Sequence, residues 1–293
     1  MAALDGYTIG FIGLGLMGTP MARNLHAAGA KLIVHNRSQA VVDKLVAEGM
    51  TQVNTPAEAT AAGIVILMLS DTPAVEAVIK GPSGVLEKIG DGDLLIDMGT
   101  STVSATRKLA AAVIARSSDY IDAPVSGGTI GAESGSLTIM AGGSESALIQ
   151  AMPIFEVLGA KTTHVGDVGA GQIAKAANQI IVGLNIGAVA EALTLARRAG
   201  ADPARVRAAL SGGFADSRIL EVHGQRMIDG AFAPGGKCVT QRKDMDQVLE
   251  LAAELRLELP GTLLYRDLYD RVIADGHGEL DHAALIKAIE PKS

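Results

Sequence analysis

The feature that most constrains the fold lies near the start of the chain, where a short apolar segment runs directly into a glycine pattern. Residues 8–18 read TIGFIGLGLMG and place Gly13, Gly15 and Gly18 in a G-x-G-x-x-G spacing. The first glycine permits a tight turn out of a strand, the second lets the backbone approach a pyrophosphate, and the third lets the next helix pack on the sheet. A helix to about residue 28 and a second strand at Lys31–His35 complete the pattern. The segment therefore predicts a dinucleotide-binding βαβ unit.

The alternation of strands and helices continues to about residue 163, which predicts a mostly parallel sheet covered by helices. We expect six strands, at Thr8–Ile12, Lys31–His35, Ile64–Leu69, Leu94–Asp97, Tyr120–Ala123 and Leu137–Ala141. Helices are expected at Pro56–Ala61, Thr72–Ile79 and Ser101–Ala115, each near a Ser, Thr or Pro start signal. Ligands of such sheets bind beyond the carboxyl ends of the strands. The segments MLSDTP, IDMGTST and IDAPVSGG are therefore candidate site segments.

The pattern changes after Gly166, where residues 171–198 form one long helical segment without proline. Further helices are expected at Pro203–Leu210, Ser217–Ile228, Lys243–Leu255, Pro260–Ala274 and Asp281–Ile289. The predicted fold class is α/β, with an N-terminal Rossmann-type doubly wound sheet followed by an all-α C-terminal domain built on one long helix. We place the nucleotide-binding domain at residues 1–166 and the helical substrate and oligomerisation domain at 167–293.

Composition narrows the function classes. Hydrophobic residues make up 48% of the chain and the net charge is −7, without a basic block, which argues against a nucleic-acid partner. The single cysteine, Cys238, cannot form an internal disulfide, and the first residues lack a secretory signal, so we expect a cytoplasmic protein. The apolar stretches Ile64–Leu69 and Ile180–Ala196 are expected to be buried core, with no membrane partner. An apolar helix this long predicts a homo-oligomer.

The residues after the second expected strand indicate which cofactor binds. NAD enzymes usually place an acidic residue there for the ribose hydroxyls, but this chain has Asn36, Arg37 and Ser38. No carboxylate would repel a 2′-phosphate, and Arg37 offers a guanidinium suited to one, so NADP(H) is favoured over NAD(H). Asp43 lies well into the next helix. The loop residues expected to contact the cofactor are Gly13, Leu14, Gly15, Leu16, Met17 and Gly18, joined by Leu69 at a later strand end.

Two segments could bind or transform a substrate. Lys175 and Asn178 share one face of the long helix with Gly171. A lone lysine is usually a surface residue whose stem packs on apolar neighbours, but a glycine in the first turn would let a ligand or another backbone come close. The second segment is Ser126, Gly127 and Gly128, whose hydroxyl and N–H groups could hold a carboxylate or simply form a turn.

The histidines predict no metal site. His277 and His282 lack the H-E-x-x-H spacing and are interpreted as surface or capping residues, and His35, His164 and His223 as structural ones. There is no G-x-S-x-G motif, and no signature places Cys238 beside a catalytic base, so nucleophilic hydrolysis is not expected.

Four segments in order resemble the β-hydroxyacid dehydrogenases, a family that includes the 3-hydroxyisobutyrate dehydrogenases. They are GFIGLGLMGTPMARNL, DAPVSGGTIGAESGSLTIMAGG, GAGQIAKAANQ and the pair Lys243–Asp244, and they span nearly the whole chain. Within the family, ANQIIVGLNIGAVAEAL, GGFADSRILEVHGQRM and LDHAALIK look most like the tartronate semialdehyde reductase branch. The segment PGGKCVTQRKD departs from the usual aromatic and leucine-containing approach to Lys243.

The resemblance implies an active site between the two domains and a homotetramer or homodimer. Lys175 matches the catalytic lysine and Asn178 the neighbouring amide, with Gln179 where many relatives carry a second asparagine. The resemblance also assigns Ser126, Gly127 and Gly128 to the carboxylate of a small substrate, and Thr100 and Lys243 to the cofactor. The implied reaction is hydride transfer between nicotinamide and a small 3-hydroxy or 3-oxo acid, with Lys175 as general acid or base. The branch implies reduction of tartronate semialdehyde to D-glycerate.

Three alternatives remain. The chain could oxidise 3-hydroxyisobutyrate, L-serine or another small 3-hydroxy acid. It could be an imine reductase, although such relatives generally replace the lysine. It could also be a non-catalytic nucleotide-binding protein, because a fold does not fix a function.

Overall fold

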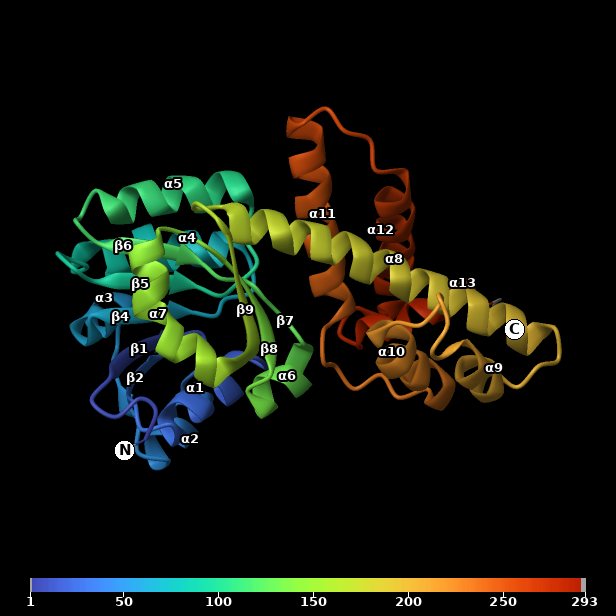
Figure 1. Ribbon diagram of the computed structural model, residues 1–293, viewed down its shortest axis with the longest axis horizontal. Coiled ribbons are helices and arrows are strands. Elements are labelled where there is room, and N and C mark those ends of the chain that lie inside the picture. Colours follow the sequence, from blue (N-terminus) through green and yellow to red (C-terminus); the bar gives the residue numbers. More distant parts are fainter. Residues whose placement is uncertain (1, 291–293) are drawn as a thin grey trace. The chain divides into compact units, whose positions relative to one another are not determined.

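The computed structural model describes residues 2–290, and the chain divides into two compact units. The first unit ends at Lys175 and the second begins at Ala176. The division falls within α8 (Ala170–Arg198), which Figure 1 shows as one long helix. The predicted boundary at residues 166 and 167 lies just before this helix. We describe each unit by itself.

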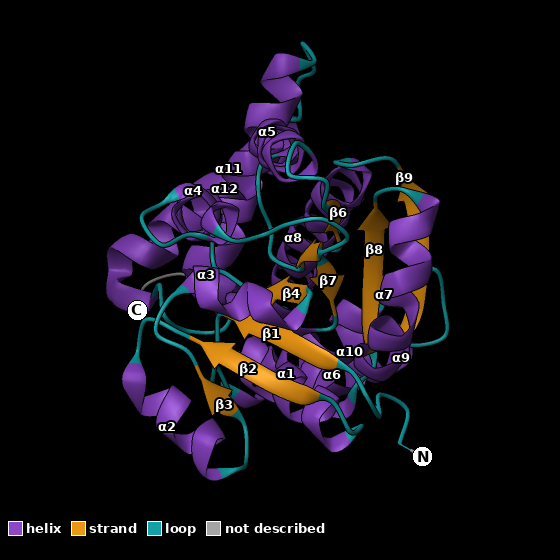
Figure 2. Ribbon diagram, turned by 90° about the vertical axis from the view of Figure 1, so that its left-hand side faces the viewer, coloured by secondary structure: helices purple, strands orange, loops and turns teal. Residues whose placement is uncertain are grey.

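The first unit contains one sheet, which includes nine strands among the described residues. The strands are β1 (Thr8–Ile12), β2 (Lys31–His35), β3 (Thr51–Gln52), β4 (Ile64–Leu67), β5 (Leu94–Asp97), β6 (Asp119–Asp122), β7 (Val125–Ser126), β8 (Leu137–Gly142) and β9 (Gly159–Gly166). The order β3-β2-β1-β4-β5-β6 is parallel throughout, and β8 runs antiparallel to β6 and β7. Figure 2 shows β1 and β2 side by side and pointing the same way. The strand order reverses between β1 and β4, which is where ligands bind in such sheets.

All six predicted strands are present, and the Rossmann-type sheet is confirmed. The sequence did not predict β3, β7 and β9. The strands β3 and β7 have two residues each, and β9 is largely exposed, so none carries the apolar run that marks a buried strand.

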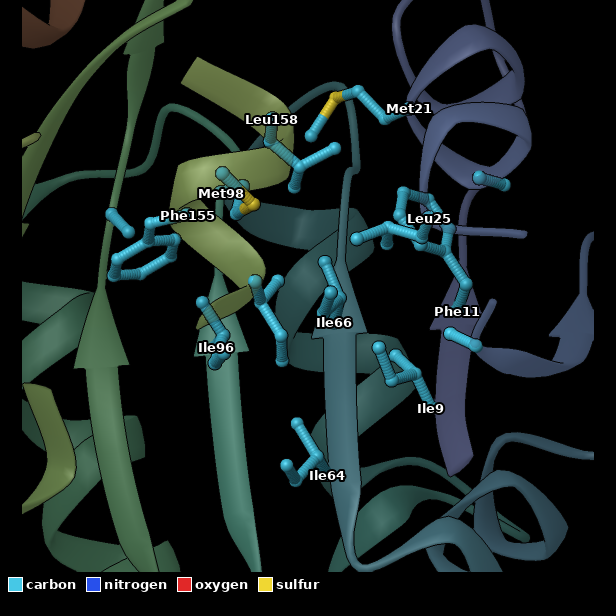
Figure 3. Packing of buried hydrophobic residues seen from close by; sticks show 14 of the residues in the cluster. Ile9, Phe11, Met21, Leu25, Ile64, Ile66, Ile96, Met98, Phe155 and Leu158 are labelled. Atoms are coloured by element: carbon cyan, nitrogen blue, oxygen red, sulfur yellow. The ribbon is translucent and has the colours of Figure 1, made fainter. Parts of the chain in front are cut away.

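Helices cover both faces of the sheet. They are α1 (Gly18–Ala27), α2 (Gln39–Ala47), α3 (Pro56–Ala59), α4 (Thr72–Lys80), α5 (Val103–Ile114), α6 (Gly128–Ser134) and α7 (Glu145–Leu158), with short 3₁₀ turns at Thr60–Ala62 and Val85–Glu87. Alternate strand residues point to opposite faces. Ile64 and Ile66 therefore pack with α1 and α7 in one cluster (Figure 3), while Val65 and Leu67 pack with α4 and α5 in another. Burial on both faces explains the continuous apolar runs of the parallel strands.

The second unit is entirely helical within the described residues. Its elements are the rest of α8, α9 (Pro203–Leu210), α10 (Arg218–Asp229), α11 (Cys238–Glu254), α12 (Pro260–Val272), a π turn (Ile273–His277), a 3₁₀ turn (His282–Leu285) and α13 (Ile286–Ile289). The helix α11 begins five residues before its predicted start. Cys238 is fully buried and its N–H donates to the carbonyl of Leu280. A tertiary contact therefore fixes the first residue of α11, which the local sequence does not indicate.

The helix α8 is long and apolar enough to cross a membrane, by length and composition alone. However, its residues Ile186, Ala190 and Leu193 are fully buried in the core of the second unit. The core therefore accounts for part of its apolar character. The prediction of a buried stretch at residues 180–196 holds only in part, because Ile181 and Leu195 are 62% and 71% exposed.

Candidate functional site

The glycine turn after β1 has the geometry that a dinucleotide requires. Gly13 has a φ of +99°, which disfavours any other residue, and a side chain there would also meet the neighbouring Leu69. Gly15 faces open space, with no atom within 4 Å of where its Cβ would stand. The helix α1 then begins at Gly18, and its N-cap Met17 makes no side-chain capping hydrogen bond. The first N–H groups of α1 and its positive dipole end therefore suit a pyrophosphate.

Asn36 links this turn to the end of β2. Its Oδ1 accepts from the N–H of Leu14 at 3.0 Å, and its Nδ2 donates to the carbonyl of Ser38 at 3.1 Å. Arg37 and Ser38 are exposed, and Asp43 on α2 is hydrogen-bonded to Gln39. The structure thus places Asn36 against the glycine turn, and its side chain shapes the turn.

Two further strand ends lie at the same edge of the sheet. A side chain at Gly99 would meet the carbonyl of Leu69 at 2.9 Å, so the segments after β4 and β5 approach closely. Gln172 on α8 clamps the segment around Thr100: its Oε1 accepts from Ser101 at 3.1 Å and its Nε2 donates to the carbonyl of Gly99 at 3.0 Å. Thr100 is half-buried between these two contacts.

Lys175 is buried, with 9% of its surface exposed. Its Nζ donates to the carbonyl oxygen of Val125 at 2.7 Å. The next residue, Ser126, ends β7, and Gly127 and Gly128 have φ values of +137° and +60° and lead into α6. The structure therefore brings the ammonium of Lys175 to the segment that the sequence assigned to a substrate carboxylate.

Asp122 is fully buried at the end of β6, three residues before Val125. Its Oδ1 accepts from the N–H of Gly169 at 2.7 Å, and its Oδ2 accepts from the N–H of Gln172 at 2.8 Å. Burial raises the pKa of Asp122 to about 7, opposed by these backbone hydrogen bonds and assisted by the nearby charge of Asp97.

The remaining candidate residues lie in the second unit. Asn178 donates to Oε1 of Gln179 at 2.7 Å, and Gln179 donates to Oδ2 of Asp244 at 2.6 Å and to Oε1 of Gln241 at 3.1 Å. Lys243 pairs with the other oxygen of Asp244 at 2.7 Å. The partner of Asn178 is thus its neighbour Gln179. A chain of amides and one carboxylate connects Asn178 to Lys243.

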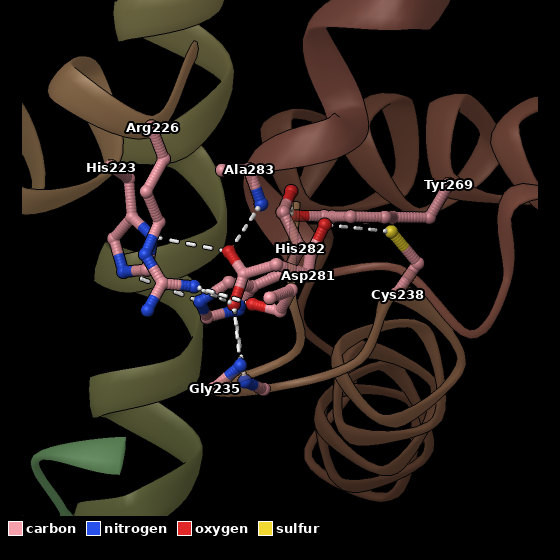
Figure 4. A network of polar contacts seen from close by, with 10 residues as sticks. His223, Arg226, Gly235, Cys238, Tyr269, Asp281, His282 and Ala283 are labelled. Atoms are coloured by element: carbon pink, nitrogen blue, oxygen red, sulfur yellow. Dashed lines mark hydrogen bonds and ion pairs between the residues drawn. The ribbon is translucent and has the colours of Figure 1, made fainter. Parts of the chain in front are cut away.

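A separate polar network in this unit centres on Asp281, which is fully buried (Figure 4). Its Oδ1 lies 3.4 Å from Nδ1 of His223, and its Oδ2 lies 2.6 Å from the guanidinium of Arg226. Three backbone N–H groups also donate to it, from Gly235, Gly236 and Ala283. Burial would raise the pKa of Asp281, but the hydrogen bond from His223, the charge of His282 and the backbone donors outweigh it and lower that pKa below its ordinary range.

The two histidines of this network face each other, with 3.3 Å between their Nε2 atoms. By distance alone, they and Asp281 could hold a metal ion. Both oxygens of Asp281 are already engaged, however. The interpretation of His282 as a surface or capping residue was wrong, since it is half-buried against a histidine 59 positions away. Burial also raises the pKa of Cys238 to about 12, which makes this thiol unsuited to act as a nucleophile.

The sequence interpretation did not identify three buried polar residues near these sites: Asp122, Gln172 and Gln241. Asp122 and Gln172 do lie inside the quoted segments DAPVSGG and GAGQIAKAANQ. A carboxylate at the end of an apolar strand and an amide in the first turn of an apolar helix were the available signals.

Known proteins confirm the class that the fold indicates. A family model for the NAD-binding domain of 6-phosphogluconate dehydrogenase matches residues 8–166, and one for the NAD-binding of NADP-dependent 3-hydroxyisobutyrate dehydrogenase matches residues 169–289. The chain is 48% identical to 2-hydroxy-3-oxopropionate reductase of Escherichia coli, over 96% of this chain and 97% of the relative.

Two solved structures share the fold over the whole length. A Mycobacterium tuberculosis 3-hydroxyisobutyrate dehydrogenase with L-serine has a TM-score of 0.89 at 29% identity, covering 97% of this chain and 99% of that one. The structure of Psf3 in complex with NADP⁺ and 2-OPP has a TM-score of 0.88 at 26% identity, covering 96% and 100%.

Fold, glycine turn and relatives together define a nicotinamide-dependent oxidoreductase that acts on a CH–OH group. The chain belongs to the β-hydroxyacid dehydrogenase family.

Proposed function

We propose that this protein reduces 2-hydroxy-3-oxopropionate, also called tartronate semialdehyde, to D-glycerate, with Lys175 as the proton donor. One observation carries the catalytic role: a buried ammonium lies 2.7 Å from the carbonyl of Val125, directly before Ser126 and its glycines. The substrate class is supported by the 48% identity to the Escherichia coli reductase of that compound.

The proposed chemistry needs a proton donor and an anion grip. The nicotinamide, when bound, supplies the hydride for the carbonyl carbon. Lys175 donates a proton from Nζ to the carbonyl oxygen as negative charge develops there, and its positive charge stabilises that oxygen. In the oxidation direction the same nitrogen takes the proton of the hydroxyl. Ser126 and the N–H groups of Gly127 and Gly128 hold the substrate carboxylate, which keeps the reacting carbon in one position.

Residues of the second unit complete the proposal. Asn178 supplies an amide to the substrate and is oriented by Gln179 at 2.7 Å. Lys243 contacts the cofactor and is held by Asp244 at 2.7 Å.

The cofactor in this proposal is NADPH rather than NADH. Arg37 and Ser38 are exposed where β2 ends, and the closest later carboxylate, Asp43, is engaged by Gln39 at 2.7 Å. An exposed guanidinium can form two hydrogen bonds to a 2′-phosphate, which NADH lacks. We expect Arg37→Asp to raise the KM for NADPH at least about tenfold while leaving that for NADH within about threefold, in line with the loss of a charge-assisted hydrogen bond. Equal effects on both cofactors would contradict the preference.

Steady-state rates on a panel of compounds test the activity. We expect rapid NADPH-dependent reduction of 2-hydroxy-3-oxopropionate and slower oxidation of D-glycerate, 3-hydroxyisobutyrate and L-serine. Lys175→Ala should abolish turnover and leave NADPH binding within about threefold, because the lysine acts on the substrate oxygen. If the semialdehyde is inert while L-serine or 3-hydroxyisobutyrate is oxidised, the lysine chemistry stands and the substrate is wrong. Near-native turnover by Lys175→Ala would overturn the role of the lysine.

A further inference from the structure

The start of α8 is attached to the end of β6 by a single buried side chain. The N–H groups of a first helical turn have no partners within the helix. At the start of α8, the N–H of Gly169, the residue directly before the helix, donates to Oδ1 of Asp122 at 2.7 Å, and the N–H of Gln172 in the first turn donates to Oδ2 at 2.8 Å. A carboxylate in this position is also favoured by the positive end of the helix dipole.

The surrounding backbone leaves room for this carboxylate. A Cβ at Gly142 would lie 2.7 Å from its Oδ1, and a Cβ at Gly171 would lie 2.9 Å from its Oδ2. Real Cβ atoms do not approach so closely. Backbone atoms are equally close or closer, with the carbonyl oxygen of Asp122 at 2.4 Å from a Cβ at Gly171 and the N atom of Gly171 at 2.7 Å from one at Gly142, so the backbone packing itself requires glycine at both positions. The carboxylate therefore lies where the segments of Gly142 and Gly171 pack closely on the end of β6.

The same short segment holds α8 a second time. Val125 follows Asp122 by three residues and accepts from Nζ of Lys175 at 2.7 Å, and Lys175 follows Gln172 by three residues. The segment from 122 to 125 therefore contacts two successive turns of the helix. The side chain of Gln172 adds a third attachment. It donates to the carbonyl of Gly99 at 3.0 Å and accepts from the N–H of Ser101 at 3.1 Å.

We propose that Asp122 is a positioning residue for Lys175, fixing the first turn of α8 so that the ammonium lies beside Val125 and Ser126. The inference rests on the proposed catalytic role of Lys175. The alternative is that Asp122 only stabilises the fold. Against that alternative, burial raises the pKa of Asp122 to about 7, so its charged form is costly, whereas a neutral residue could cap the helix without that cost.

The two hydrogen bonds from Gly169 and Gln172 need the ionised form of Asp122, because each of its oxygens accepts an N–H group. The titratable or charged groups around it are Asp97 on β5, Tyr120 within β6, Arg107 beside Gly169, His164 beside Gly143, and Lys175 itself. Protonation of Asp122 replaces one acceptor with a donor, which should loosen the first turn of α8.

Kinetics of Asp122→Asn test the proposal. The amide has the same size but turns an NH₂ towards a backbone N–H. We expect kcat to fall about 10- to 100-fold, the cost of a small displacement of a catalytic group, with KM for the cofactor within about twofold. The acid limb of the kcat profile, expected near pH 7 in the wild type, should disappear. Asp119→Asn, at the other end of the same strand, is the matched control and should keep wild-type kinetics.

A chemical probe separates this proposal from the proposed function. The rate at which an acylating reagent labels Lys175 is measured by mass spectrometry from pH 5.5 to 9, in the wild type, Asp119→Asn and Asp122→Asn. We expect a change in slope near pH 7 that Asp122→Asn alone abolishes. Unchanged labelling and kinetics in a folded Asp122→Asn would overturn the positioning role. If that variant does not fold, the wild-type profile decides, since a smooth profile without the change near pH 7 contradicts the proposal. A wild type inactive on every hydroxy acid, with the labelling shift intact, would defeat only the proposed function.

Discussion

Each unit of this protein contains a fully buried aspartate at the centre of a polar network, Asp122 in the first and Asp281 in the second, and the two are stabilised in different ways. Asp281 in the helical unit contacts the guanidinium of Arg226 and the ring of His223, and its pKa is lowered. Asp122 in the nucleotide-binding unit accepts two backbone N–H groups at the start of α8, and burial raises its pKa to about 7.

The difference shows what each carboxylate contributes. A buried charge with a good cationic partner is strongly destabilising to break, because the partner is then left unpaired. A buried charge held by backbone dipoles alone stays costly, and its retention calls for another reason. We infer that Asp281 serves the stability of its unit, whereas Asp122 serves the geometry of Lys175.

The largest expected effect comes from removing the charge of Asp281. Asp281→Asn leaves Arg226 without its counterion and should lower the free energy of unfolding of the second unit by about 3–5 kcal/mol. The exposed ion pair between Arg218 and Glu221 provides the control, since both lie on α10, the helix of Arg226. Glu221→Gln should lower the free energy of unfolding by less than about 1 kcal/mol. Because the chain has no tryptophan, urea unfolding is followed by far-UV circular dichroism, with hydrogen exchange to assign the unit. Equal losses in the two variants would contradict the contrast.

The second prediction concerns the pH dependence of the free energy of unfolding, to which the two aspartates should contribute with opposite sign. Between about pH 4 and 7 the folded state binds a proton at Asp122 that the unfolded state has released, so stability should fall as pH rises. The fall should total at most roughly 4 kcal/mol, from about three pKa units at 1.4 kcal/mol each. The contribution of Asp281 is present above its unfolded pKa near 4 and is lost as pH falls further. Subtracting the stability of Asp122→Asn from that of the wild type at each pH isolates the Asp122 part, which should decline from pH 4.5 to 8. A flat difference would mean that the carboxylate is not destabilised by burial.

The same two regions show which features of the structure could be predicted from the sequence. The glycine spacing, the apolar strand runs and the long helix predicted the Rossmann sheet and the helical unit, because periodicity and turn chemistry are local properties. The segments of Lys175 and Ser126 were also identified, and the structure joins them through Val125. The partner sets of Asp122 and Asp281 were not predicted. Asp122 meets Gln172 across 50 positions and His223 meets His282 across 59, and only tertiary structure brings such residues together.

The smallest expected effect sharpens the comparison most. At pH 8 the ionised Asp122 carries its burial cost of at most roughly 4 kcal/mol, which Asp122→Asn removes. The same change leaves one buried backbone N–H and the amide NH₂ that faces it without acceptors, at about 1–3 kcal/mol each. The two changes nearly cancel, so the free energy of unfolding should stay within about 1 kcal/mol of the wild type while kcat falls. Urea titrations of the wild type, Asp122→Asn and Asp119→Asn at pH 8 measure this, beside the kinetics of the same preparations. A loss as large as that of Asp281→Asn would show that both aspartates serve stability, and the separation of roles between the two units would fail.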